Sequence, residues 1–303
     1  MMNRGHIFII LQAVLFGISI PIVQVSVATI PVWLFTAMTF GIACIVMVPL
    51  ARHVDGIKLT DIGRKNMVGI LMSSLLGGVV LYTLFLLYGL KYSSAVSVAV
   101  INSLTPAVTL ILSFFILRES LIWQKVLAIG FAVASVLVMN VNGASSHGGN
   151  IIGLLLMILA VVCVSLFFIY AKRFSVELPP FTLTAGLFTI SFIITLPIGI
   201  YQAFSFNWSV MNFSLWAQVF YYGIGAILLP YLLTYIGITQ VPASFAGISM
   251  AVVPVASTLV AVLFYHTALK VTDVLALILV IISIVVSEAR RKAIQTQTEV
   301  LEK

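Results

Sequence analysis

Acidic side chains, which could relay a proton or bind a cation, lie outside the long apolar segments of this sequence. All eight fall in polar connections, at segment ends or in the C-terminal tail. A carboxylate in the middle of an apolar segment would be the usual candidate for a relay. The sequence therefore predicts no buried relay, although a peripheral acid such as Glu119 or Asp273 could still take that role. For Glu119 we favour a structural role, paired with Arg118 or Lys125 or capping a helix.

Motifs for catalysis or metal binding are absent from the sequence. The four histidines are scattered near segment ends, and there is no HExxH, CxxC or GxSxG pattern and no phosphate-binding glycine loop. Cys44 and Cys163 lie inside apolar segments, where cysteine behaves as a small hydrophobe. We therefore predict that the chain is not an enzyme and binds neither a metal nor a cofactor. The net charge of +7 comes from basic residues near segment ends, which argues against a nucleic-acid partner.

Neutral polar residues inside the apolar segments remain as candidates for binding a small molecule. In the segment 94–116, Asn102, Thr105 and Thr109 fall on one side of a helix, at about 100° per residue. Pro106 has no N–H group, so it leaves the carbonyl group of Asn102 without its helical partner. The Asn102 side chain could contact a substrate or could bond a neighbouring helix, and the sequence favours neither alternative.

Three further segments contribute candidate residues. Gln12 lies more than a turn inside the segment 6–25. Gly223 and Gly225 come before Pro230 and predict a bend. This bend would lie near Tyr231 and Tyr235. For the tyrosines, a core or interfacial role competes with ligand contact. The predicted substrate-binding residues are Gln12, Tyr82, Asn102, Thr105, Thr109, Tyr231, Tyr235, Met250 and Ser257, and the predicted helix bends are at Pro21, Pro106, Pro230 and Pro254. A cavity that is polar on one wall and apolar on the other suits a neutral or zwitterionic metabolite with an apolar part, such as an amino acid.

The elements that must position these residues are membrane-spanning helices. Hydrophobic residues make up 62% of the 303 residues and charged residues only 8%, a composition that excludes a soluble domain. A helix needs about 20 apolar residues to cross a bilayer. The apolar segments predict an all-α membrane protein with ten transmembrane helices, near 6–25, 30–51, 66–88, 94–116, 124–142, 151–171, 180–203, 214–237, 243–264 and 270–287.

Basic residues are distributed unevenly between the two sides of these ten segments. Thirteen of the fifteen Lys and Arg residues lie on one side, and only Lys91 and Lys270 lie on the other. Because loops rich in Lys and Arg remain in the cytoplasm, this asymmetry predicts that both termini are cytoplasmic.

An internal repeat divides the sequence in two. A shift of 148 residues aligns 89–121 with 237–269 without a gap, and it places Pro106 on Pro254. Small residues recur at every fourth position in both copies, a pattern typical of closely packed membrane helices. The shift spans five helices, an odd number, so the second half is predicted to cross the membrane in the opposite direction.

These residues resemble the EamA-type permeases of the drug/metabolite transporter superfamily. The resemblance rests on the stretch Gly89 to Ala95, on Pro106, on the Arg118-Glu119 pair and on the second copy around Pro254. It implies two five-helix repeats, at 1–142 and 150–287, followed by a cytoplasmic tail at 288–303. Thr267, where this family often has an acid, and Phe16-Gly17, where Trp-Gly is common, depart from the family pattern.

The resemblance and the inverted repeat together predict a transporter. We expect a multi-pass protein of the cytoplasmic membrane that moves small organic metabolites by alternating access, with a small-molecule substrate and the lipid bilayer as its partners. The alternatives are a passive channel or facilitator and a membrane scaffold without transport. The sequence indicates neither the substrate, nor the direction of transport, nor a coupling ion, nor an oligomeric state.

Overall fold

In the computed structural model, all regular secondary structure of the described residues is helical. These are 4–57, 59–75, 79–92, 101–102, 104–119, 123–140, 151–174, 178–265, 271–272, 274–275 and 277–286. The first half contains α1 (Arg4–Thr29), α2 (Val32–Val54), α3 (Arg64–Leu75), α4 (Val80–Tyr92), α6 (Thr105–Leu117) and α7 (Trp123–Asn140). The second half contains α8 (Ile151–Phe174), α9 (Pro180–Ser205), α10 (Phe213–Tyr221), α11 (Leu229–Ile238), α12 (Ala243–Ser249), α13 (Val252–Tyr265) and a helix at Leu277–Val286.

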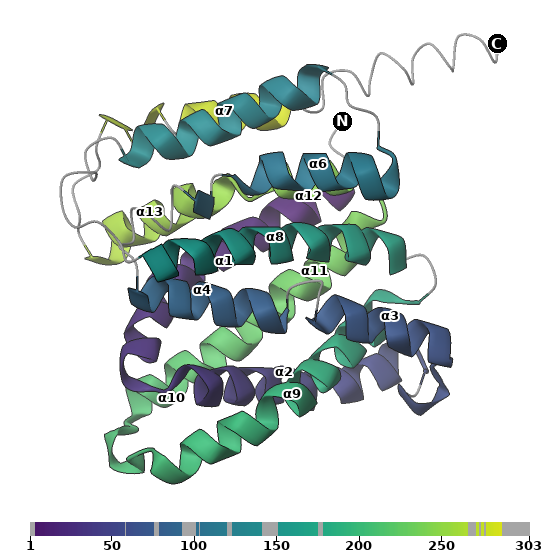
Figure 1. Cartoon of the computed structure of the whole chain (residues 1–303), viewed down its shortest axis with the longest axis vertical. Coiled ribbons are helices and arrows are strands. Elements are labelled where there is room, and N and C mark those ends of the chain that lie inside the picture. Colours follow the sequence, from purple (N-terminus) through teal and green to yellow (C-terminus); the bar gives the residue numbers. More distant parts are fainter. Residues whose placement is uncertain are drawn as a thin grey trace.

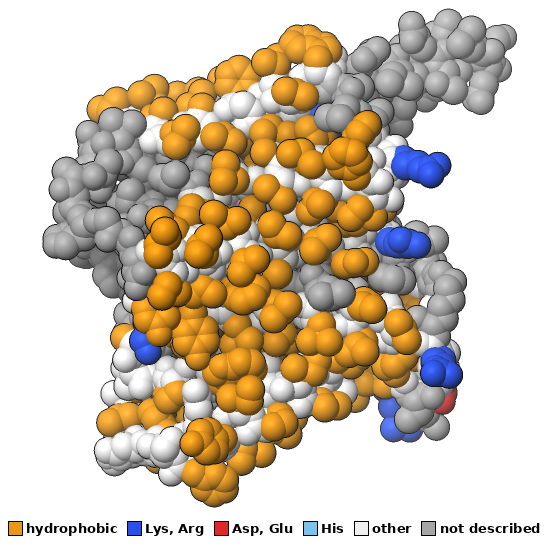
Figure 2. All heavy atoms as spheres, in the orientation of Figure 1, with side chains coloured by type: hydrophobic (Ala, Val, Ile, Leu, Met, Phe, Trp, Pro, Cys, Tyr) orange, Lys and Arg blue, Asp and Glu red, His pale blue; other side chains and the backbone are white. Residues whose placement is uncertain are grey.

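Several of these helices are long and apolar enough to cross a membrane. Within the described residues, five stretches meet both conditions: Val32–Val54, Asn66–Tyr92, Ile151–Arg173, Pro180–Ser205 and Phe213–Ile238. Figure 2 shows hydrophobic side chains spread over the broad face of the bundle and Lys or Arg side chains only at its margins. Because lipid requires an apolar surface and water solvates charges, this distribution is that of a multi-pass membrane protein.

Two of the predicted helices are interrupted ahead of a proline. Pro106 is the second residue of α6, after a turn at Leu104. In the second half, α12 ends at Ser249 and α13 begins at Val252, shortly before Pro254. Since Pro254 has no N–H group, the carbonyl oxygen of Met250 accepts a bond of 3.1 Å from the Val253 amide instead.

The predicted segment 214–237 contains a different irregularity. A π-helix at Tyr222–Leu228 lies between α10 and α11, and the Leu229 amide bonds the Ile224 carbonyl oxygen, five residues back. Pro230 follows directly, in the first turn of α11. The wider π turn changes the direction in which the following side chains point. Pro21, in contrast, lies within the uninterrupted helix α1.

Helices from the two halves of the chain alternate in the bundle. α1 packs against α11 and α13, while α8 packs against α4 and α6. α6 contacts α12, and α2 runs along α9. α7 lies at the outer edge (Figure 1), where its Ala128 carbonyl oxygen accepts a 2.6 Å bond from the Ser283 hydroxyl group. The core therefore lies between the two halves of the chain.

The α2–α9 pair is held at both ends by helix caps that cross between the halves. Asp55, which ends α2, accepts bonds of 2.7 Å from both the amide and the hydroxyl group of Thr182 in α9. At the opposite end, Gln202 of α9 accepts a 3.1 Å bond from the Leu34 amide of α2. Because the first amides of a helix lack intrahelical partners, each helix satisfies its neighbour's first turn.

Candidate functional site

One pocket in the described part of the chain lies between helices of both halves. It is lined by Gln12, Phe16, Tyr82, Val164, Phe167, Phe168, Pro230, Tyr231, Thr234 and Met250, which come from α1, α4, α8, α11 and the break between α12 and α13. The cavity between these side chains has a volume of about 20 Å³, which is room for about one water molecule. The pocket is narrow, so a metabolite could enter it only if aromatic side chains move apart.

The polar groups of this pocket are the Gln12 amide and the hydroxyl groups of Thr234, Tyr82 and Tyr231. Gln12 is 5% exposed, and its Nε2 donates to the Met250 sulfur at 3.7 Å. A thioether is a weak acceptor, so this bond satisfies the amide only in part. The Thr234 hydroxyl group donates to the Pro230 carbonyl oxygen at 2.8 Å, which leaves the Thr234 oxygen free to accept.

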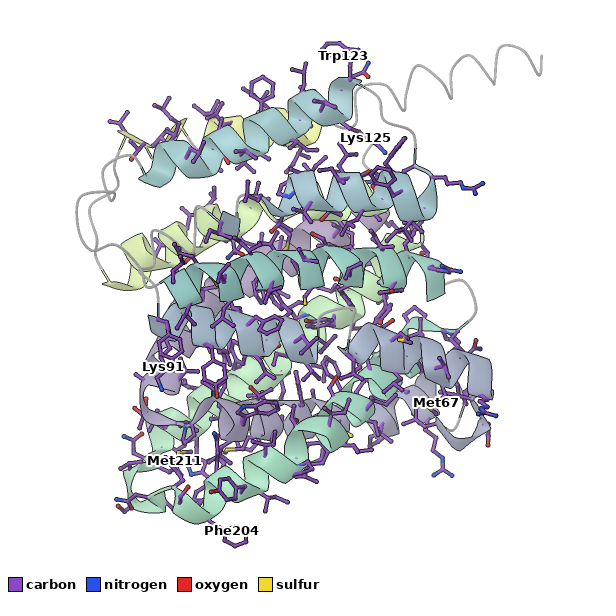
Figure 3. The ribbon with its side chains drawn as sticks, in the orientation of Figure 1. Met67, Lys91, Trp123, Lys125, Phe204 and Met211 are labelled. Carbon is purple, nitrogen blue, oxygen red and sulfur yellow. The ribbon has the colours of Figure 1, made fainter. Side chains whose placement is uncertain are left out.

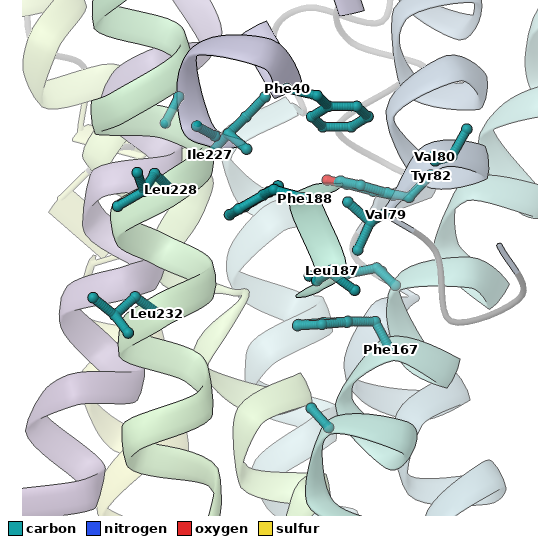
Figure 4. Packing of buried hydrophobic residues seen from close by; sticks show 14 of the residues in the cluster. Phe40, Val79, Val80, Tyr82, Phe167, Leu187, Phe188, Ile227, Leu228 and Leu232 are labelled. Atoms are coloured by element: carbon teal, nitrogen blue, oxygen red, sulfur yellow. The ribbon is translucent and has the colours of Figure 1, made fainter. Parts of the chain in front are cut away.

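Aromatic rings form most of the remaining wall. The Phe167 and Tyr231 rings meet edge to face with their centroids 4.8 Å apart, and the Phe16 and Tyr82 rings lie 6.0 Å apart. Figure 4 shows Tyr82, Phe167 and Phe188 converging from three different helices. These separations are those of attractive aromatic pairs.

No charged side chain of the described residues lines the pocket. An isolated ion that is moved from water into such a site loses several kcal/mol of hydration free energy. A desolvated cation placed over an aromatic face regains about 2 kcal/mol or more, which offsets part of this loss for a cation and none of it for an anion. The lining therefore favours an uncharged ligand. Within the described residues, no cluster of His, Cys, Asp and Glu is placed to hold a metal ion.

A second polar cluster lies at the end of the bundle where α12 begins. Glu119 follows α6, and its two carboxylate oxygens accept bonds from the Ala243 amide at 2.7 Å and from the Ser244 hydroxyl group at 2.6 Å. Lys125 of α7 donates to the same carboxylate at 3.1 Å. Glu119 thus joins the first half of the chain to the start of α12, as a partner of Lys125 and a helix cap. We call this arrangement the Glu119 clamp.

Competing effects set the pKa of Glu119. Burial alone would raise the pKa of this carboxyl group, but bonds from Ser244, the charge of Lys125 and the Ala243 amide outweigh burial and lower the pKa below its usual value of 4.5. The carboxyl group is therefore ionised at neutral pH.

Sequence comparison places this architecture among known proteins. The model of the EamA-like transporter family matches the chain twice, over residues 3–141 and 151–288. The chain belongs to the EamA-like transporter family. This membership indicates a membrane transporter rather than an enzyme.

Two relatives of this EamA-like chain come from Bacillus subtilis (strain 168). The chain is 32% identical over 246 residues to the uncharacterized transporter YetK. The matched region covers 80% of this chain and 74% of YetK. It is 28% identical over 255 residues to the uncharacterized transporter YyaM, with coverage of 82% and 81%. A protein crystal structure with 21% sequence identity matches with a TM-score of 0.79 over 97% of this chain and 99% of that one, which shows the fold alone.

The pocket of the EamA-like chain brings together part of the predicted site. Gln12, Tyr82, Tyr231 and Met250 line it, together with Pro230. The other predicted residues, Asn102, Thr105, Thr109, Tyr235 and Ser257, do not. They belong to the helical residues 101–102 ahead of α6, to α6 itself, to α11 and to α13.

Two of these other residues have partners in α8. The hydroxyl group of Thr109 donates to the Ser165 hydroxyl group at 2.9 Å, between α6 and α8. Tyr235 is 2% exposed, and its ring lies edge to face against the Phe167 ring of α8 at 5.8 Å. These contacts connect α6 and α11 to α8.

Sequence reasoning missed the contribution of α8. Val164, Phe167 and Phe168 had no polar group to draw attention, and Phe16 and Thr234 were also not predicted as site residues. The repeat was the available signal, because the shift of 148 residues places Phe16 on Val164. Once α1 carries a site residue, an inverted repeat implies that α8 faces the same pocket.

We expect Gln12→Ala to weaken substrate binding while expression and melting temperature stay near those of the parent protein. The change removes one hydrogen bond in a desolvated pocket, and we expect a loss of about 1–3 kcal/mol, roughly 5- to 150-fold in affinity. Asn102→Ala tests whether the substrate path reaches the residues ahead of α6, and we expect it to weaken transport as well. Unchanged transport in both variants would contradict the site assignment.

Proposed function

We propose that this chain is an alternating-access transporter of small organic metabolites, built from ten transmembrane helices in two inverted five-helix repeats at 1–142 and 150–287. The observation that carries the proposal is the origin of the pocket, whose walls come from helices of both halves. A pocket between two near-equivalent halves can be exposed to either side of the membrane when the halves rock against each other.

The packing of the helices supports an inverted repeat. A shift of about 148 residues relates α1 to α8, and it relates the α11 and α13 partners of α1 to the α4 and α6 partners of α8. The caps of the α2–α9 pair follow the same relation, because the shift places Leu34 on Thr182. The twofold match of the family model agrees with this division.

The chemistry of the pocket indicates which class of substrate it can bind. Its aromatic and aliphatic wall accepts an apolar group, and the Gln12 amide and the Thr234 oxygen bond a polar end. Metabolites of about the size of an amino acid, with one apolar part, fit this description. A thermal-shift screen of the purified protein against a metabolite library identifies the compound, because binding to the folded state raises apparent stability.

Counterflow in proteoliposomes tests the mechanism. Vesicles that contain the purified protein are loaded with the unlabelled compound from the screen and diluted into a trace of the labelled compound. We expect a transient accumulation of label, which requires a binding site that faces the two sides in turn. Uptake without accumulation would indicate a channel or facilitator, and no protein-dependent uptake would indicate a scaffold.

We expect both termini of the chain to lie in the cytoplasm. Figure 3 shows Lys91 and Met211 toward one end of the bundle, and Met67 and Lys125 toward the other. With Cys44 and Cys163 replaced by serine, a single cysteine at the exposed Ser209 should react with an impermeant thiol reagent in intact cells. A cysteine at Arg64 should react only after lysis, and the reverse pattern would contradict the orientation.

A further inference from the structure

The pocket combines an aromatic wall with a single amide group, and four charged side chains of the described chain are bonded to other groups. Glu119 and Lys125 bond each other. Lys172 of α8 donates to three carbonyl oxygens at the end of α11, the shortest bond being 2.7 Å to Ile238. Asp55 is held by Thr182 at the end of α2. None of these charges is available to neutralise an ion in the pocket.

Four of the aromatic side chains that line the pocket form two contacting pairs. Phe16 and Tyr82 approach from α1 and α4, with their ring planes inclined by 41°. Phe167 and Tyr231 approach from α8 and α11, with their ring planes at 68°. A planar ring admitted among these side chains can pack against them edge to face or offset, and both arrangements attract. A saturated ring of the same size would gain burial but not this geometry.

Gln12 is the one amide among the described residues that line the pocket. Its amide nitrogen is buried and faces the Met250 sulfur at 3.7 Å, in the break between α12 and α13. An oxygen acceptor on a ligand would bind this amide more strongly than a thioether does. Met250 has a flexible side chain and can move aside.

We propose that the pocket selects an uncharged aromatic solute that carries one hydrogen-bond acceptor, and that it rejects ions of the same shape, zwitterions included. This inference rests on the proposed function, because it specifies the substrate class of the same pocket. It narrows the range of metabolites to those with a planar ring and a neutral acceptor such as an amide or ester carbonyl group.

Five small probes separate the features of this proposal. Benzamide carries the ring and the neutral acceptor. Benzoate, benzylammonium and phenylalanine keep the ring and add a negative charge, a positive charge or both. Cyclohexanecarboxamide keeps the acceptor without the aromatic ring. Binding of each is measured by saturation-transfer NMR titration of the full-length protein in nanodiscs, with empty nanodiscs as the reference for partition into lipid.

We expect benzamide to bind at least tenfold more tightly than any of the charged probes and several-fold more tightly than cyclohexanecarboxamide. Gln12→Ala should weaken benzamide binding 5- to 150-fold. Gln218→Ala should leave it unchanged, because Gln218 bonds Ser26 at the far end of α1. This control removes the same amide from another place in the fold.

A charged probe that binds as tightly as benzamide would overturn the proposal, as would equal binding of benzamide and cyclohexanecarboxamide. Benzamide binding that is insensitive to Gln12→Ala, or no binding above that of empty nanodiscs, would also overturn it. The experiment measures binding without transport. Selective binding of benzamide combined with failed counterflow would therefore contradict the proposed function. It would still support the proposed ligand class.

Discussion

Replacing Glu119 with alanine is expected to lower the melting temperature of the purified protein and to reduce transport. The change removes the bonds at 2.7 Å and 2.6 Å to the start of α12 and leaves Lys125 without its partner. Loss of a helix cap costs about 0.5–2 kcal/mol, and each hydrogen bond to a charged group contributes about 1.5–3 kcal/mol. We therefore expect a destabilisation of about 2–4 kcal/mol.

Transport should also respond to the loss of the Glu119 clamp. The clamp joins the loop after α6, in the first half, to α12 in the second half, so it has to break whenever these two halves separate at this end. Without it, the bundle should open more often at this end. A cysteine that replaces Met250, in the Cys44→Ser and Cys163→Ser background, should react faster with an impermeant thiol reagent in inside-out vesicles.

Two further variants divide the clamp into its parts. Lys125→Met removes the ion pair but keeps the cap on Ala243 and Ser244, so we expect a smaller loss of stability than in Glu119→Ala. Glu119→Gln keeps one neutral acceptor and should be intermediate. Melting temperatures equal to that of the parent in Glu119→Ala would refute a structural role for the clamp.

Lowering the pH should weaken the contact between Glu119 and the start of α12. Because the pKa of Glu119 is lowered in the folded protein, the ionised carboxyl group contributes its full stabilisation above the usual pKa of 4.5. That contribution falls as the pH drops below 4.5 and through the lowered value. The stability difference between the parent and Glu119→Gln should therefore be constant near neutral pH and should shrink below about pH 4.5. A difference that shrinks above pH 5 instead would contradict the lowered pKa.

Gly17→Ala is the second change for which a large effect is expected, because α1 and α13 touch through their backbones at this residue. A Cβ atom added at Gly17 would lie 2.5 Å from the Val253 carbonyl oxygen and 2.8 Å from the Ala256 Cβ atom. A backbone oxygen cannot rotate away, so the two helices would have to separate. Overpacking of this kind costs about 1–3 kcal/mol, and occasionally more. We expect a melting temperature lower by several degrees and a disturbed pocket, since Phe16 is the neighbouring residue.

Gly130→Ala is the matched control for Gly17→Ala. A Cβ atom added at Gly130, on the outer helix α7, would meet no atom within 4 Å. Alanine also favours a helix over glycine by about 1 kcal/mol, so this variant should melt at the parent temperature or above it. Equal melting temperatures for Gly17→Ala and Gly130→Ala would contradict the close contact between α1 and α13.

Composition and spacing were enough to predict the class of the protein. Long apolar segments without charge have one stable environment, a bilayer, and in it they must be helical because every backbone polar group needs an internal partner. The Glu119 cap was also within reach, because an acid shortly after a predicted helix has few other roles. Gln12 could be predicted for a related reason, since an amide inside an apolar segment is conspicuous.

The composition of the pocket was decided only by the tertiary structure. Phe167 and Phe168 look like ordinary lipid-facing or core residues in sequence, and only the packing of α8 against α4 brings them to Tyr82. Conversely, Thr109 is polar and near the middle of its helix, yet its hydroxyl group bonds Ser165 between helices. Helical periodicity states which residues share a face of one helix. It does not state what that face meets, because the rotation of each helix depends on close packing with neighbours that are far away in the sequence.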